Sequence, residues 1–124
     1  MPLKSFLTAA LAVIGVGLLS PVHAQNTIKV GVIAEFSGPF ADYGAQIEAG
    51  MKAYMKEHGD TVAGKKVELI TRDTKGPAPD VAKRFAQELI TRDQVQFLAG
   101  FGLTPNAMAV APGSTASNSA SARN

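Results

Sequence analysis

The sequence contains no cysteine, so the chain can form no disulfide and must draw its stability from an apolar core. The absence of cysteine also leaves no residue of this type for the attachment of a lipid. It also lacks an excess of charge: the formal net charge is +2, and it falls to +1 if the segment ending at Ala24, whose only charged group is Lys4, is removed. Such a balance argues against the basic surface that nucleic acid or an anionic membrane would require.

Signatures of catalysis are missing too. The sequence has no G-x-x-x-x-G-K-[ST] loop and no G-x-S-x-G nucleophile elbow, and the run Gly-Phe-Gly-Leu-Thr-Pro at 100–105 begins like a dinucleotide fingerprint but ends in proline. Apart from His23 the only histidine is His58, near the end of an expected helix, where the ring commonly caps carbonyls. No spacing of His, Cys, Asp and Glu indicates zinc. We therefore expect no enzyme activity, no cofactor and no metal.

The start of the chain, from Met1 to Ala24, has the features of a secretory signal peptide. Lys4 supplies a short positive region, residues 6–19 form an uncharged apolar run, and Val22 and Ala24 place small residues at A-x-A-like positions. This pattern predicts cleavage after Ala24 and a soluble periplasmic protein that does not insert into the membrane. The alternative is an uncleaved anchor, but a spanning helix needs roughly 20 apolar residues, more than this run provides.

From residue 25 the hydrophobic pattern alternates between strands and helices. This order predicts an α/β fold with a three-layer parallel sheet, joined by right-handed crossovers, whose strands lie in the order second, first, third. Val32, Leu69 and Phe97 are expected at central positions of the three strands. The expected strands are 28–36, 65–73 and 95–99, and the expected helices are 42–58, 79–92 and a third beginning over 106–111.

The two longer helices should each bury an apolar stripe. The stripe of the first contains Tyr43, Ile47, Met51 and Tyr54 or Met55, and that of the second contains Val81, Phe85, Leu89 and Ile90.

The domain is assigned to residues 25–112. After Pro112 the sequence has small and polar residues without a large apolar side chain, which predicts a disordered tail over 113–124. Two interpretations stay open: a flexible tail on a small domain, or a fragment of a longer protein.

Ligands of open parallel sheets bind outside the carboxyl ends of the strands. Three segments reach that edge: 36–43, 73–79 and 100–106. Hydroxyls and amides near helix N-termini suit a carboxylate, and aromatic rings suit an apolar side chain. The alternatives are plain turn chemistry, a core role for the tyrosine, and a structural role for Asp73. The candidate ligand-binding residues are Ser37, Tyr43, Phe101, Gly102 and Thr104.

The segments named so far resemble the leucine/isoleucine/valine-binding proteins, the periplasmic receptors of branched-chain amino acid and amide ABC transporters. The resemblance rests on Ile28–Val32 with Ser37–Gly44, on Glu68–Asp73 with Pro79–Leu89, and on Phe97–Gly100 with Thr104 and Ala107–Pro112. It implies that residues 25–112 form an incomplete N-terminal lobe of a two-lobed type I periplasmic binding fold, which traps its ligand between the lobes. Thr104 matches the family's carboxylate-binding hydroxyl, and Tyr43 matches the aromatic of its side-chain pocket. From Gly113 onward we see no match.

The function expected from these observations is ligand capture for import, without chemistry. The resemblance implies that the complete protein would bind an amino acid or amide and deliver it to an inner-membrane ABC permease. One alternative is a periplasmic sensor of the same fold, and a more remote one is an exported α/β enzyme. A neighbouring permease gene would favour import.

Overall fold

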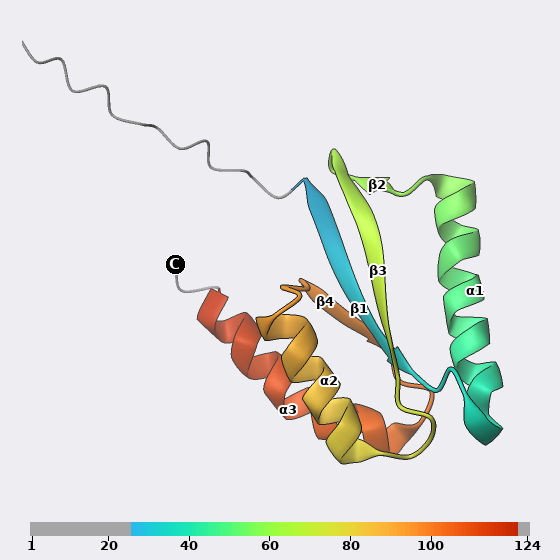
Figure 1. Ribbon diagram of the computed structural model, residues 1–124. Helices are drawn as coiled ribbons and strands as arrows, with labels where there is room; N and C mark the ends of the chain where they lie inside the picture. Colours follow the sequence, from blue (N-terminus) through green and yellow to red (C-terminus); the bar gives the residue numbers. More distant parts are fainter. Residues whose placement is uncertain (1–25, 122–124) are drawn as a thin grey trace, which may run out of the picture.

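The computed structural model describes residues 26–121, in which helices lie on both sides of a four-stranded sheet (Figure 1). The predicted signal peptide lies outside these residues. No helix between residues 26 and 121 is long and apolar enough to cross a membrane. The elements are β1 (Thr27–Ala34), the 3-10 helix η1 (Gly38–Phe40), α1 (Ala41–His58), β2 (Thr61–Val62), β3 (Lys65–Asp73), α2 (Pro79–Thr91), β4 (Phe97–Gly100) and α3 (Thr104–Ser121).

The predicted parallel sheet is confirmed. The strand order is β2-β3-β1-β4, and both β3 and β4 run parallel to the central strand β1. Val30 faces Leu69 on one side and Phe97 on the other, which fixes the register. The very short strand β2 was not predicted. It pairs antiparallel with the start of β3 through a tight turn in which Ala63 and Gly64 both have positive φ, as a two-residue hairpin requires.

Two strand boundaries differ from the prediction for local reasons. β1 ends at Ala34 rather than Phe36, because the Glu35 carbonyl accepts a hydrogen bond from the Gly44 amide and so leaves the ladder. β4 begins at Phe97 rather than Val95, because the Val95 amide donates back to the Leu89 carbonyl at 3.0 Å. Both segments are used to close loops: the one at Glu35 lies at the carboxyl edge of the sheet, and the one at Val95 lies at the amino edge, where the Gln96 amide donates to the Lys29 carbonyl.

The apolar core lies between the sheet and the pair α2 and α3. Its fully buried members are Ile33, Ala82, Ala86, Leu89 and Val110. The predicted stripe of α2 was therefore partly wrong: Leu89 is buried, but two alanines are the other buried residues, while the larger Val81, Phe85 and Ile90 are half-buried. The alanines let α3 approach α2 closely, which moves the most buried line of the helix toward them.

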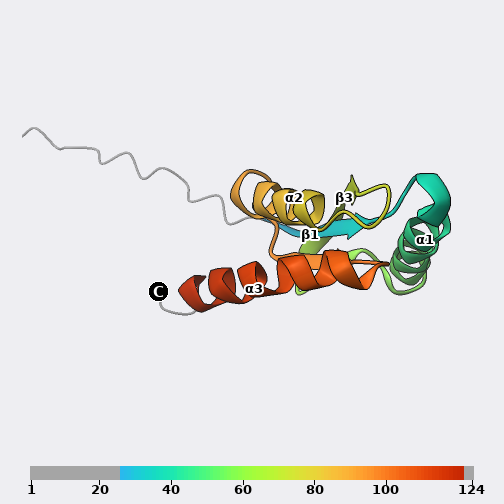
Figure 2. The same ribbon diagram turned by 90° about the horizontal axis from the view of Figure 1, so that it is seen from below.

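Helix α1 lies on the other side of the sheet, apart from α2 and α3 (Figures 1 and 2). Gly44 is its only buried residue, and Tyr43 and Tyr54, which were expected in the buried stripe, are 47% and 64% exposed. The other expected members, Ile47, Met51 and Met55, are half-buried. His58 lies at the helix end as expected, with Nδ1 3.2 Å from the Tyr54 carbonyl.

Helix α3 extends much further than the sequence indicated. It continues through Pro112 to Ser121, so residues 113–121 are helical where a disordered tail was predicted. The prediction relied on the absence of large apolar residues, and that absence removes an apolar stripe but not the capacity to form helical hydrogen bonds. Alanine has the highest helix propensity, and serine and threonine are only moderately unfavourable.

Candidate functional site

The three predicted segments do meet at the carboxyl edge of the sheet. The strands β1 and β3 end side by side, with Ala34 opposite Asp73, and β4 ends at Gly100 opposite Ile33. Figure 1 shows the loops that follow β1 and β3 at this same edge, close to the start of α2. Parallel strands place their carboxyl ends together, so residues far apart in sequence become neighbours here.

Asp73 ties the loop after β1 to the loop after β3. Its Oδ1 accepts hydrogen bonds from the amides of Phe36 and Lys75, at 2.9 and 2.8 Å, and its Oδ2 accepts one from the Ser37 hydroxyl at 2.6 Å. Partial burial raises the pKa of Asp73, but these bonds to Ser37, Phe36 and Lys75 outweigh it and hold the pKa below its usual value. Asp73 therefore has a structural role, which was one of the alternatives that the sequence left open. The Ser37 hydroxyl donates its hydrogen bond to Asp73.

This carboxylate should make the stability of the chain depend on pH. Since its pKa is lower in the folded chain than the ordinary value of 3.8, Asp73 stabilises the fold above about pH 4 and loses that contribution as pH falls through the folded pKa. We expect Asp73→Asn to lower the free energy of unfolding by about 1–2 kcal/mol at pH 7 and by less at pH 2.5. Urea unfolding at both pH values is the measurement, with the exposed Glu57→Gln as control. An equal loss at both pH values would contradict this role.

A second set of hydrogen bonds between these loops comes from three buried polar residues that were not among the predicted site residues. Glu35, Thr74 and Asn106 are 0%, 4% and 0% exposed. The Asn106 amide nitrogen donates to Glu35 Oε1 at 2.8 Å and to the Gly76 carbonyl at 3.0 Å, and lies 3.3 Å from Thr74 Oγ1. Its Oδ1 accepts from the Ala78 amide at 2.8 Å. The first turn of α3 is thereby fastened to the loops after β1 and β3.

Tyr43 and Gly102, two of the predicted ligand-binding residues, lie close together. A Cβ atom built on Gly102 would lie 2.9 Å from Tyr43 Cβ and would collide with Glu35 Oε2. The glycine is thus needed for close packing of these two loops. Tyr43 is 47% exposed and stacks on Phe40, with ring centroids 6.1 Å apart. Its ring is on the surface of the site rather than in the core.

Thr104 and Phe101 lie in different surroundings. Thr104 is exposed and is the first residue of α3, so its hydroxyl and the nearby amides stand at a helix N-terminus. Phe101 has a positive φ of 63°, and its amide donates to the Ile33 carbonyl at 2.6 Å. Its ring packs against the core cluster, so the structure does not bring Phe101 and Tyr43 together as a pair. The ligand contacts of all five candidate residues remain predictions.

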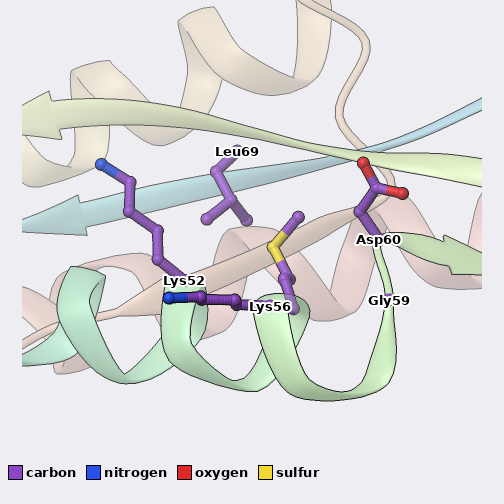
Figure 3. A pocket seen from close by; sticks show the side chains of 6 residues that line it. Lys52, Lys56, Gly59, Asp60 and Leu69 are labelled. Atoms are coloured by element: carbon purple, nitrogen blue, oxygen red, sulfur yellow. The ribbon is translucent and has the colours of Figure 1, made fainter.

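Two hollows formed by the described residues lie away from this edge. One, of about 500 Å³, opens between α1 and β3 and is lined by Lys52, Met55, Lys56 and Leu69 with the turn at Gly59 and Asp60 (Figure 3). Another, of about 470 Å³, lies between α2 and α3. Neither collects the polar groups of the three loops. Within residues 26–121 no group of three His, Cys, Asp or Glu side chains is placed to hold a metal ion.

The sequence profile described as "Periplasmic binding protein" matches residues 27–119 of the chain. The match includes part of the segment after Gly113, where the sequence analysis had found no resemblance. A curated relative, Leu/Ile/Val-binding protein homolog 6 of Brucella abortus (strain 2308), is 46% identical over 110 residues. That alignment covers 89% of this chain and 28% of the relative, so the chain spans little more than a quarter of the curated relatives it matches.

Solved structures give the same result. The solute-binding protein of an ABC transporter from Rhodopseudomonas palustris BisB5, in complex with 3,4-dihydroxybenzoic acid, is 52% identical with a TM-score of 0.70, covering 73% of this chain and 25% of that one. The branched-chain amino acid transporter substrate binding protein LivJ of Streptococcus pneumoniae, in complex with isoleucine, is 26% identical with a TM-score of 0.65, covering 73% and 26%. On the profile match and these identities, the chain belongs to the periplasmic binding protein family.

Proposed function

We propose that the complete protein captures a small carboxylate-bearing ligand, an amino acid or amide or an aromatic acid, and delivers it to an ABC permease. The observation that carries this proposal is the convergence of three loops on one sheet edge with the exposed Thr104 at the start of an 18-residue helix. The positive end of a helix attracts a carboxylate, and here the Thr104 hydroxyl stands at that end; Pro105 has no N–H and the Asn106 amide already donates to the Leu103 carbonyl at 3.1 Å, so the hydroxyl is the donor that this turn offers. Tyr43 supplies an aromatic surface beside it. The relatives support transport because they are substrate-binding proteins of transporters.

The ligand class follows from what related receptors hold. One relative carries 3,4-dihydroxybenzoic acid and another isoleucine, and both ligands have a carboxyl group next to an apolar body. The binding test uses a chimeric receptor in which residues 27–119 replace the matching segment of the R. palustris BisB5 protein. Titration calorimetry with branched-chain amino acids, amides and hydroxybenzoates should show saturable binding. A folded chimera that binds none of them would reject the proposal.

Thr104→Ala in this chimeric receptor should weaken binding about 10- to 150-fold, because a hydrogen bond to a charged carboxylate contributes about 1.5–3 kcal/mol. Thr61→Ala, an exposed threonine on β2, is the control and should leave the affinity unchanged. Calorimetry gives both dissociation constants. Unchanged affinity of the Thr104 variant would remove this residue from the site.

We also propose that the protein reaches the periplasm through a signal peptide cleaved after Ala24. The support is the sequence pattern described above and the family to which the chain belongs. Protein released by osmotic shock should begin with Gln25 when its N-terminus is sequenced. A product that keeps residues 1–24 and stays with the membrane fraction would contradict this.

A further inference from the structure

Glu35 is a fully buried carboxyl group with one unused oxygen. Its Oε1 lies 2.8 Å from the Asn106 amide nitrogen and 3.2 Å from the Thr74 hydroxyl, whereas Oε2 is buried without any hydrogen-bond partner. Among the buried side-chain atoms of the described residues, it is the only one in that condition. Leaving a buried acceptor unpaired is unfavourable, so native proteins seldom do so without a reason.

The position of Oε2 is fixed by the hydrogen bonds that the other oxygen of the carboxyl group, Oε1, accepts. Because Oε1 is held from two sides, the carboxyl group cannot turn Oε2 toward the interior donors. Oε2 points instead at Gly102, where even a Cβ atom would collide with it, and that same Cβ would touch Tyr43. At Gly102 the oxygen is therefore covered by a backbone segment without a side chain, and the Tyr43 Cβ lies close to the same glycine.

This cover is thin and lies on the solvent side. Gly102 is exposed, and the Tyr43 side chain is 47% exposed. Gly102 is also close in sequence to Thr104, the proposed carboxylate contact. A small shift of the Tyr43 ring or of the segment around Gly102 would open Oε2 to a molecule bound at the sheet edge.

We propose that Glu35 Oε2 is the acceptor for a hydrogen-bond donor on the ligand, either an ammonium group or a hydroxyl. This inference rests on the proposed function and adds to it a selectivity: ligands that carry both a carboxyl group and an N–H or O–H donor bind better than their donor-free analogues. Glu35 is then a ligand-contacting residue at one end of the site, with Thr104 at the other.

Glu35→Gln tests this directly. A glutamine can keep its Oε1 on Asn106 and Thr74 while it places an NH₂ group where the free oxygen was, so that a ligand donor would meet another donor. Calorimetry on the chimeric receptor compares 4-hydroxybenzoate with benzoate, and isoleucine with 3-methylpentanoate. For whichever pair binds, we expect the variant to weaken the donor-bearing member about 10- to 100-fold and to leave the donor-free member within about twofold.

The control is Glu48→Gln, the same chemical change on α1, where Glu48 pairs with Lys52 at the surface. The pair that responds identifies the donor as a hydroxyl or an amine. Equal weakening of both members would mean that Glu35 only supports the fold, and no weakening would mean that the ligand does not reach it; either result overturns the inference while the proposed function stands. If the unmutated chimera binds no ligand, both fail.

A crystal structure of the chimera with its ligand is the second measurement, and it decides the matter if the glutamine variant does not fold. We expect a ligand nitrogen or hydroxyl oxygen within hydrogen-bond distance of Glu35 Oε2. A water molecule in that place, or an oxygen still sealed under Gly102, would overturn the inference.

Discussion

Asn106→Ala is expected to lower the free energy of unfolding by about 2–4 kcal/mol, a large effect for one polar side chain. Asn106 is fully buried and uses both ends of its amide group. Its removal would leave the half-buried Ala78 amide and Gly76 carbonyl without this partner and Glu35 Oε1 with one donor fewer, and each buried polar group left unpaired is unfavourable by about 1–3 kcal/mol. Urea unfolding of the chain measures the loss.

Two further variants sharpen this prediction. Asn106→Asp keeps the acceptor for Ala78 but replaces the donor to Glu35 Oε1 by a second acceptor, so it should be at least as destabilising as alanine at pH 7. Gln46→Ala removes an exposed amide from α1 and should change stability by no more than about 0.5 kcal/mol. A loss below about 1 kcal/mol for Asn106→Ala would show that water replaces its hydrogen bonds.

Two glycines of α1 should respond to alanine in opposite directions. Alanine in an exposed helix normally stabilises relative to glycine by about 1 kcal/mol, and Gly50 has nothing within 4 Å of a built Cβ, so Gly50→Ala should show this gain. At Gly44 the Cβ would collide with the Glu35 carbonyl oxygen, which already accepts the Gly44 amide at 3.0 Å. Gly44→Ala should therefore cost about 1–3 kcal/mol despite the better propensity.

The measurement is the difference in urea midpoint between the two variants, with helix content followed by circular dichroism. Because both substitutions are chemically identical and lie on one helix, propensity cancels and the remaining difference reports the contact between α1 and the end of β1. If both variants gain stability, α1 can move away from β1 without a loss of stability. The packing of Tyr43 against Gly102 would then not depend on the close contact between α1 and β1.

The fold was predictable because its signals are local or follow from general rules. The apolar run around Val30, the helical spacing through Phe85 and the turn residues at Pro79 each indicate an element, and right-handed crossovers then restrict the strand order. The hairpin at β2 was missed because a strand of two exposed residues has no period to detect. Its signal was Gly64, since a two-residue turn needs residues that accept positive φ.

The candidate site was predictable only in part. Its position followed from the sheet edge, and Tyr43, Gly102 and Thr104 all lie there. Glu35 and Asn106 could not be found, because they lie far apart in the sequence and each looks like a surface residue in its own segment. One signal did exist for Glu35: it directly follows the apolar run Val30–Ala34, whose near-continuous apolar character is typical of a strand covered on both faces.

The place of β1 in the sheet has a consequence for how the chain reaches this structure. Among the described strands the first in sequence, β1, is an inner one, and its partners follow later, because Val30 must wait for Leu69 on one side and for Phe97 on the other. Closing such distant pairs costs chain entropy before any ladder hydrogen bond forms, and topologies of this kind fold slowly. An emerging chain therefore lacks the first partner of β1 until Asp73 has been made and the second until Gly100 has been made, so both apolar edges of this strand stay unpaired while α1 and the hairpin at β2 are synthesised.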